Sequence, residues 1–211
     1  MWKHLLFEAA ALALAPERCA ACDEPVRMLT VFCPACVRTV VRAPAPSSTV
    51  LVAPFLYGGA LATAITRFKY QRRPDLARPL SALLARAVSV LAKDAPDVVV
   101  PVPLHPSRLA ERGYNQAALL ARPVARALGA RFGPLALART RETEKQAVLD
   151  REARLQNLAG AFLVRAARDV AIKRVLLVDD VRTTGATLRA CEDALTAAGA
   201  STVTCAVLAL A

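Results

Sequence analysis

Residues 175–187 restrict the fold of this chain more than any other stretch, and they read Val-Leu-Leu-Val-Asp-Asp-Val-Arg-Thr-Thr-Gly-Ala-Thr. The four apolar residues at the start do not alternate with polar ones, which predicts a parallel strand buried on both faces. Two carboxylates, Asp179 and Asp180, follow directly, and apolar residues at helical spacing begin after Gly185. The stretch therefore predicts a central strand, a polar loop at its carboxyl end and a helix that starts at the loop.

The predicted loop carries the groups of a sugar-phosphate site. The N-terminus of a helix offers free backbone N–H groups and the positive end of the helix dipole, and threonine hydroxyls add further donors for a phosphate. Asp179 and Asp180, at the solvent-facing end of the strand, are acceptors suited to the vicinal hydroxyls of ribose, and we expect them to be catalytic. The predicted 5-phosphate-binding residues are Val181, Arg182, Thr183, Thr184, Gly185, Ala186 and Thr187.

The same string resembles the motif by which type I phosphoribosyltransferases bind phosphoribosyl pyrophosphate (PRPP). A Walker A loop would need a Gly-Lys-Ser/Thr ending, and a dinucleotide-binding fold would need Gly-x-Gly-x-x-Gly near a strand. The sequence contains neither string. The remaining alternative is an ordinary strand, turn and helix in which Asp180 only caps the helix.

The rest of the sequence predicts an α/β domain. Apolar segments typical of strands alternate with segments of helical periodicity, which predicts a mainly parallel sheet flanked by helices, with right-handed crossovers. Ligands of such sheets bind at the carboxyl ends of the strands. The predicted strands are residues 49–55, 97–104, 131–138, 160–164, 174–178 and 202–208, the predicted helices are residues 61–68, 76–88, 117–128 and 185–198, and a turn is predicted at Gly58 and Gly59.

A second site is predicted in residues 105–116, a polar loop at the end of the apolar strand 97–104. Its Arg108 and Arg112 would bind the pyrophosphate of PRPP beside the first site. His105 is either a general base or a structural residue of a His-Pro turn. The polar residues 139–146, with the charged stretch that follows to Asn157, predict a mobile lid, and a plain exposed helix or loop is the alternative.

Four cysteines near the N-terminus form two Cys-x-x-Cys pairs, Cys19 with Cys22 and Cys33 with Cys36. Each pair can place two thiolates on one turn, and two such turns make a tetrahedral site suited to Zn²⁺, so we predict a small zinc-ribbon-like module. Two disulfides or a thioredoxin-like redox site are the alternatives. The other two cysteines, at positions 191 and 205, are expected to be small buried residues.

The proline- and serine-bearing residues 42–48 predict a linker, and we place the domain boundary there. Residues 1–45 would contain an N-terminal helix and the cysteine module, and residues 46–211 the phosphoribosyltransferase-like domain. The apolar stretch Leu5–Ala15 is too short to span a membrane; we interpret it as an amphipathic helix, and a signal peptide is the alternative. We therefore expect a cytoplasmic protein without a membrane span.

The net charge of +11 predicts a surface that attracts polyanions such as PRPP, nucleic acid or an acidic protein. Residues 67–73 combine basic side chains with Phe68 and Tyr70. This combination is typical of a contact with an anion or with single-stranded DNA, in which the rings stack on bases. A solvated helix end is the alternative.

Together these features resemble the ComF family (ComFC/GntX-like) of phosphoribosyltransferase-like proteins, which is linked to competence and DNA uptake. The resemblance rests on the four cysteines, on Phe68-Lys69-Tyr70, on Pro101–Pro106 with Arg108 and Arg112, on the acidic motif, and on the spacing from Arg139 to Phe162. Two residues depart from the family pattern and add positive charge near the site. They are Arg72, where a small residue is common, and Arg182, where a tyrosine or an aliphatic residue is common.

The resemblance implies a site for PRPP with Mg²⁺ and a role in handling imported DNA. If the protein is an enzyme, it transfers ribose-5-phosphate to an acceptor and releases pyrophosphate. A non-catalytic protein is the alternative, one that senses PRPP or a nucleotide while it engages single-stranded DNA or a competence helicase. A third interpretation is a salvage enzyme of nucleoside metabolism, for which the cysteine module has no evident use.

Overall fold

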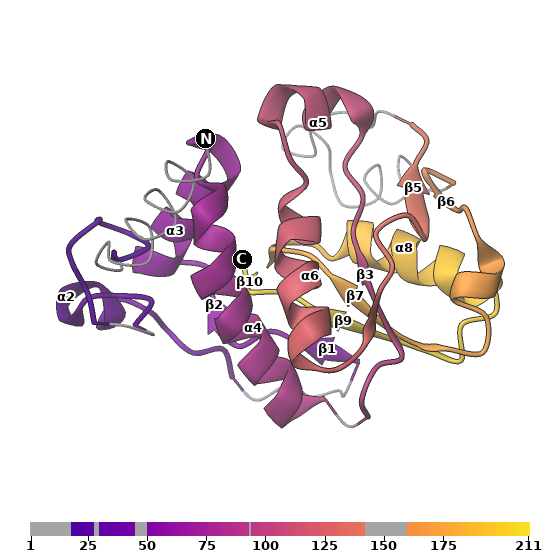
Figure 1. The fold of residues 1–211 in the computed structure, drawn as a ribbon, viewed down its shortest axis with the longest axis horizontal. Helices are drawn as coiled ribbons and strands as arrows, with labels where there is room; N and C mark the ends of the chain where they lie inside the picture. Colours follow the sequence, from indigo (N-terminus) through magenta and orange to yellow (C-terminus); the bar gives the residue numbers. More distant parts are fainter. Residues whose placement is uncertain (1–17, 28–29, 45–49, 93, 142–159) are drawn as a thin grey trace, which may run out of the picture.

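The computed structural model describes residues 18–27, 30–44, 50–92, 94–141 and 160–211. The predicted N-terminal helix or signal peptide at residues 5–15, residues 45–48 of the predicted linker and residues 142–157 of the predicted lid region lie outside the described residues. Figure 1 shows an α/β domain with a small N-terminal module beside it.

A five-stranded parallel sheet forms the centre of the domain, as the sequence predicts. Its order is β1-β9-β7-β3-β4, and every neighbouring pair is parallel. Pro101 of β3 lies opposite Val178 of β7, so the chain leaves these two strands at the same edge of the sheet. The strands are β1 (Leu51–Val52), β3 (Val98–Pro101), β4 (Arg131–Phe132), β7 (Arg174–Val178) and β9 (Thr202–Ala206).

Helices cover both faces of this sheet (Figure 1). Leu176 packs in an apolar layer with α3, α4 and α6, whereas the next residue, Leu177, packs in a second layer with α8. This alternation explains why the strand is apolar throughout. The helices are α2 (Pro34–Val37), α3 (Gly59–Tyr70), α4 (Ala77–Leu91), α5 (Pro106–Arg112), α6 (Gln116–Ala127) and α8 (Ala186–Ala197), with 3₁₀ turns η1 (Pro74–Leu76) and η2 (Ala167–Asp169).

Two smaller sheets complete the described part of the domain. Three short parallel strands have the order β2-β10-β8, and β5 pairs with β6 in an antiparallel hairpin. The hairpin brackets the residues of the predicted lid, because β5 precedes residue 142 and β6 follows residue 159. These strands are β2 (Phe55–Leu56), β5 (Leu137–Arg139), β6 (Phe162–Val164), β8 (Val181–Arg182) and β10 (Ala209–Leu210).

Two predicted strands are wrong in their extent, since each is divided between two sheets. Residues 49–55 supply β1 and the start of β2, and residues 131–138 supply β4 and most of β5. A proline stands at each break, Pro54 in the first and Pro134 in the second. Proline has no N–H to donate to a ladder, so the chain turns there and enters another sheet.

Two predicted loops are also wrong, because helices begin there. The interval predicted as a polar loop contains α5: the side chain of His105 accepts the N–H of Ser107, Pro106 occupies the first turn, and Gly113 ends the helix with φ of 83°. These are the usual start and stop signals of a helix. The predicted Gly-Gly turn is the N-terminus of α3, with Gly58 at the N-cap.

The N-terminal module, residues 18–44, packs directly against α3. Phe32 lies in the same apolar layer as that helix, and the hydroxyl of Thr39 accepts the N–H of Ala60 at 2.9 Å. The backbones approach so closely that a Cβ on Gly59 would lie 2.2 Å from the carbonyl oxygen of Thr39. The module and the domain therefore share one apolar layer.

Candidate functional site

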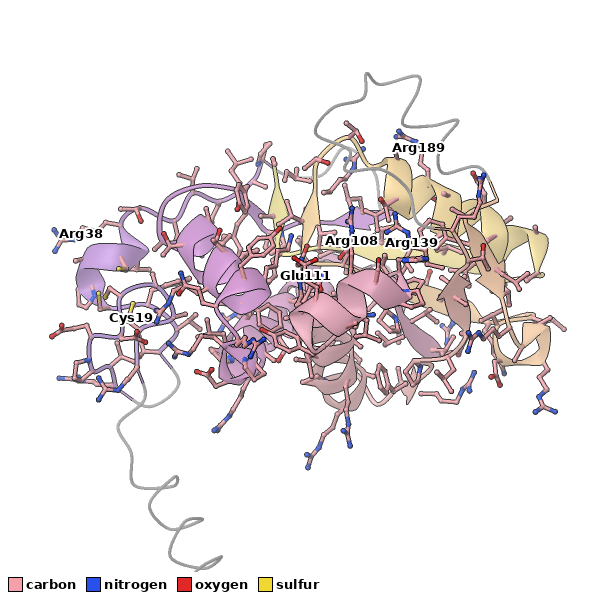
Figure 2. All side chains as sticks on the ribbon, turned by 90° about the horizontal axis from the view of Figure 1, so that it is seen from above. Cys19, Arg38, Arg108, Glu111, Arg139 and Arg189 are labelled. Carbon is pink, nitrogen blue, oxygen red and sulfur yellow. The ribbon has the colours of Figure 1, made fainter. Side chains whose placement is uncertain are left out.

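A cavity of about 370 Å³ lies at the carboxyl ends of β3 and β7. All the residues predicted to bind the sugar phosphate and the pyrophosphate line it, from Asp179 to Thr187 and at Arg108 and Arg112. Figure 2 shows Arg108 and Arg139 near the middle of the molecule, with Cys19 well to the left. The predicted position at the end of two neighbouring strands is thus the position of the cavity.

Asp180 is buried, so the expectation that both carboxylates face solvent is wrong. It is 2% exposed, and its Oδ1 pairs with Nζ of Lys69 at 2.8 Å. Its Oδ2 is buried and has no hydrogen-bond partner among the described residues. A buried carboxylate oxygen without a partner is costly, and a ligand hydroxyl or a cation in the cavity would satisfy it.

Asp179 differs from its neighbour because no cation of the described residues forms an ion pair with it. Its Oδ1 accepts the backbone N–H of Asp180 at 2.9 Å. Burial, followed by the charge of Asp180, raises the pKa of Asp179 to about 7. Although burial opposes the charge of Lys69, the attraction of Asp180 raises the pKa of that lysine. The cavity therefore contains one carboxylate paired with a lysine and one that titrates near neutral pH.

The loop after the aspartates has the geometry of an anion site. Strand β8 carries Val181 and Arg182, and Gly185 then adopts φ of 76° at the N-cap of α8. A side chain at Gly185 would be strained at this φ, and its Cβ would lie 2.7 Å from Nε of Arg182. The N–H of Ala186, the first residue of α8, donates to the hydroxyl of Thr184 at 3.4 Å, and this start of the helix lines the cavity together with Thr183. A helix N-terminus attracts an anion through its backbone N–H groups and the helix dipole.

Two arginines of the cavity lining come from α5. Arg112 donates to the side-chain oxygen of Gln116 at 2.5 Å, and its guanidinium lies 5.0 Å from the ring centre of Tyr70. Arg108 lines the cavity one turn earlier on the same helix. The cavity therefore combines these cations with the N-terminus of α8, which suits a ligand with two anionic groups.

Several lining residues were not predicted as part of the site. They are Lys69, Tyr57, Gln116 and Arg139. Lys69 follows Phe68 of the buried stripe of α3, and its sequence context indicated only a basic segment; the tertiary position of α3 gives it a carboxylate partner. His105 is absent from the cavity lining, and its Nδ1 lies 2.9 Å from the hydroxyl of Ser107 in the cap of α5, which favours the structural interpretation.

Residues 67–73, interpreted as a contact with an anion or single-stranded DNA or else as a solvated helix end, are partly used within the fold, and Lys69 and Tyr70 line the cavity. Phe68 is fully buried, and Lys69 pairs with Asp180. Arg73 pairs with both Asp23 and Asp75. Tyr70, at 69% exposure, is the ring of this segment that stays accessible. Most of the side chains that the sequence pattern suggested as DNA contacts are therefore buried or form ion pairs within the fold.

The four cysteines of the module form one cluster. All four Sγ atoms lie within 4.8 Å of one another, and those of Cys22 and Cys33 are 3.7 Å apart. A tetrahedral zinc ion with Zn–S bonds near 2.3 Å needs S···S separations of about 3.8 Å, so the cluster could hold such a metal. All six cysteines of the chain are free of disulfides, and Cys191 and Cys205 are buried as predicted.

The surroundings of the cluster favour at least one thiolate. Although burial opposes ionisation of Cys19, backbone N–H groups, above all that of Cys33, lower its pKa to about 6. Burial and the neighbouring thiols raise the pKa of Cys36 to about 12. Four thiols in such close contact ionise together only when a cation compensates their charge.

The chain is similar to proteins of several bacteria over most of its length. It is 32% identical over 198 residues to DNA utilization protein YhgH of Escherichia coli strain K12, covering 88% of this chain and 86% of that protein. It is also 32% identical over 175 residues to Competence protein F of Haemophilus influenzae, covering 81% of this chain and 74% of that protein. The phosphoribosyl transferase domain family matches residues 114–211.

Solved structures with similar folds include two enzymes. A purine phosphoribosyltransferase from Pyrococcus horikoshii has 20% identity and a TM-score of 0.40, with 64% of this chain and 72% of that chain covered. The glutamine PRPP amidotransferase of B. subtilis has 22% identity and a TM-score of 0.45, with 66% of this chain and 30% of that chain covered.

Among the described helices, none combines the length and the apolar character needed to cross a membrane.

Proposed function

Because this chain belongs to the ComF family of phosphoribosyltransferase-domain proteins, we propose that its cavity binds PRPP and transfers ribose-5-phosphate to an acceptor, with release of pyrophosphate. The observation that carries the proposal is that two carboxylates, a helix N-terminus and two arginines line one cavity. The carboxylates and the helix N-terminus suit the ribose hydroxyls and the 5-phosphate, and the arginines suit the pyrophosphate.

Each residue then has a definite part in binding. The free Oδ2 of Asp180 and the carboxylate of Asp179 accept hydrogen bonds from the ribose hydroxyls. The N–H groups and hydroxyls of residues 183–187 donate to the 5-phosphate, and Arg108 and Arg112 neutralise the leaving pyrophosphate. These cations stabilise the charge that develops when the bond at C1 of the ribose breaks.

The acidic pair also fits Mg²⁺, since a buried carboxylate oxygen without a partner is a hard oxygen ligand. Bound with PRPP, Mg²⁺ supplies Lewis-acid stabilisation of the pyrophosphate. The cysteine cluster fits structural Zn²⁺ held by Cys19, Cys22, Cys33 and Cys36. Reduced thiols agree with a cytoplasmic protein, which we also propose.

The binding test is the thermal stabilisation of the purified protein by PRPP with Mg²⁺. Asp179→Asn should lose most of this stabilisation, because it removes a carboxylate from the cavity. Asp193→Asn is the matched control, since Asp193 is an exposed acid on α8 that does not line the cavity. An equal ligand-dependent shift in wild type and Asp179→Asn would contradict the assignment.

Turnover separates an enzyme from a non-catalytic sensor of PRPP. We expect labelled PRPP to release pyrophosphate when the correct acceptor is supplied from a panel of bases, nucleotides and DNA ends. Binding of PRPP without release for any acceptor would instead support the sensor. The relatives' names, DNA utilization protein and Competence protein F, further support a role in the use of imported DNA. A deletion strain should then take up or use less DNA than its parent.

A second candidate function, binding of single-stranded DNA, is favoured by a basic hollow outside the cavity. Arg122 and Arg126 lie one turn apart on α6 and line this hollow with Phe132. Both arginines are exposed, and among the described residues neither has an acidic partner. Such a surface offers phosphate contacts and one aromatic ring.

A further inference from the structure

Helix α3 connects the cysteine module with the proposed PRPP site. Lys69, near its C-terminal end, is paired with Asp180 in the cavity, and the two side chains are 20% and 3% exposed. Arg67, two residues earlier, points to the module instead. The last turn of one helix therefore contacts both functional regions of the chain.

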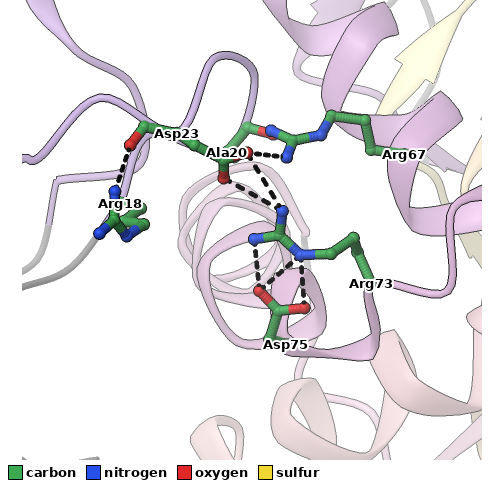
Figure 3. A network of polar contacts seen from close by, with 6 residues as sticks. All are labelled: Arg18, Ala20, Asp23, Arg67, Arg73 and Asp75. Carbon is green, nitrogen blue, oxygen red and sulfur yellow. Dashed lines mark hydrogen bonds and ion pairs between the residues drawn. The ribbon is translucent and has the colours of Figure 1, made fainter. Parts of the chain in front are cut away.

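The contact with the module converges on a single carboxylate, that of Asp23 (Figure 3). Arg67 forms an ion pair with Asp23 and also donates to the carbonyl oxygen of Ala20 at 3.1 Å. Arg73, just beyond α3, pairs with Asp23 at 3.0 Å and with Asp75 at 2.8 Å. Asp23 thus holds two arginines that lie on either side of Lys69 in the sequence.

The position of Asp23 is fixed by the turn that presents two of the cysteines. Asp23 follows Cys22, adopts φ of 61°, and donates its N–H to the carbonyl oxygen of Cys19 at 3.0 Å. A metal held by Cys19 and Cys22 would therefore also fix the Asp23 carboxylate. Because Arg67 is half-buried, its ion pair is screened less than an exposed one.

We propose that Asp23 and Lys69 are positioning residues of the ligand site, through which the cysteine module holds the end of α3. Lys69 pairs with Oδ1 of Asp180, a residue that lines the cavity, and so fixes the orientation of this carboxylate. The effect on PRPP rests on the function proposed above, whereas the contact between module and helix does not. Coupling of this kind is reciprocal in binding free energy, so bound PRPP also raises the affinity of the cysteines for the metal.

Asp23→Asn tests the proposal, because asparagine tolerates the positive φ and removes the charge. Glu24→Gln is the matched control: it removes one charge from the next residue, whose side chain is exposed and has no ion pair within the described residues. Three quantities are measured in both variants: the zinc content, the PRPP dissociation constant with Mg²⁺, and the acetylation rate of Lys69 in ligand-free protein. The exposed Lys173 provides the reference rate.

In Asp23→Asn we expect Lys69 to be acetylated faster, relative to Lys173, than in the wild type. The PRPP dissociation constant should rise by roughly fivefold or more, and fivefold is the lower end of typical coupling between sites. Glu24→Gln should match the wild type. Arg67→Gln breaks the same contact from the helix and should give both changes with zinc retained. Arg67→Lys should bring the acetylation rate and the PRPP affinity part of the way back to the wild-type values. Unchanged Lys69 reactivity in both Asp23→Asn and Arg67→Gln overturns the proposal.

The two levels of the proposal fail in different ways. Wild-type protein that does not bind PRPP removes the proposed function, while the acetylation rates still decide whether the module holds α3. Faster acetylation with unchanged PRPP affinity overturns the positioning role of Lys69. A tighter zinc dissociation constant in the presence of PRPP, measured at equilibrium in competition with a chelator, supports the coupling, and an unchanged constant contradicts it.

Discussion

The cysteine module and the α/β domain reach a fixed structure in different ways. The domain buries its central strands on both faces, between two apolar layers. In the described part of the module, the buried apolar side chains are those of Cys19, Ala20, Phe32 and Cys33, and two of these are thiols of the cluster. A segment with so small a core needs a bound metal or contact with a neighbouring domain to stay folded. The module packs against α3, and its four cysteines could hold a metal.

This difference shows where the two regions depend on each other. The module packs in the apolar layer of α3, and Thr39 and Gly59 are in close contact across the junction. The apolar layer with α8 contains no residue of the described module, whereas the layer with α3 contains four buried ones. The dependence is therefore unequal: loss of the domain should unfold the module, whereas loss of the module should disturb the domain locally.

The largest effect should come from the metal. Cys19→Ser or Cys36→Ser should release about one equivalent of zinc and unfold residues 18–44, since structural zinc contributes roughly 10–16 kcal/mol in small zinc modules. Hydrogen exchange should rise in the module and at the end of α3, and stay slow in β7 and β3. Protein that contains no zinc and two disulfides by mass spectrometry would contradict this prediction.

Substitution of the two neighbouring aspartates should affect the stability of the domain differently. Asp180→Asn leaves Lys69 buried without its partner, which should lower the free energy of unfolding by about 3–5 kcal/mol. Asp179→Asn should not destabilise the ligand-free protein at neutral pH. The folded protein raises the pKa of the Asp179 carboxyl to about 7, so ionisation of this carboxyl lowers the stability of the fold, and asparagine avoids that loss. Zinc content should stay unchanged in both variants.

The pH dependence gives a control for this pair. A carboxyl whose pKa is raised in the folded state binds more protons there than in the unfolded chain, so stability should fall as pH rises from about 4 to about 7. Asp179→Asn should remove this part of the slope in denaturant titrations at several pH values. A slope equal to that of the wild type would show that Asp179 is ionised in the folded protein throughout this range.

Local signals in the sequence predicted the centre of the fold and the residues around the cavity. Strand β7 has the predicted bounds, and the residues from Asp179 to Thr187 lie together because they are consecutive. The breaks at Pro54 and Pro134 and the helix α5 also had local signals, which the apolar runs and the polar composition obscured. The partner of Lys69 had none, since it depends on how α3 packs against the sheet. The burial of Asp180 was hidden for the same reason.

The junction itself is tested by Gly59→Ala. Gly59 has φ of 50°, and a Cβ there would lie 2.2 Å from a backbone atom of Thr39, which cannot move away as a side chain could. We expect a loss in the free energy of unfolding that exceeds the roughly 1–3 kcal/mol that backbone strain alone costs, because the added Cβ also collides with Thr39. Gly129→Ala is the control, since Gly129 has φ of 66° but nothing within 4 Å of the added Cβ. Equal losses in the two variants would mean that the junction adds nothing beyond backbone strain.

The smallest effect should appear in the binding of single-stranded DNA. Its measurement tests which of the two regions contacts the DNA phosphates. Arg122 and Arg126 line the hollow on the domain, whereas Arg38 and Arg42 are exposed on the module, where Figure 2 shows Arg38 at the far left. Each phosphate contact contributes about 0.7 to the slope of log K against log salt, so loss of two contacts should reduce the slope by about 1.4. We expect this reduction for Arg122→Ala with Arg126→Ala, measured by fluorescence anisotropy, and little change for Arg38→Ala with Arg42→Ala. The reverse result would place the contact on the module, and an unchanged slope in both would leave the basic hollow as a solvated surface.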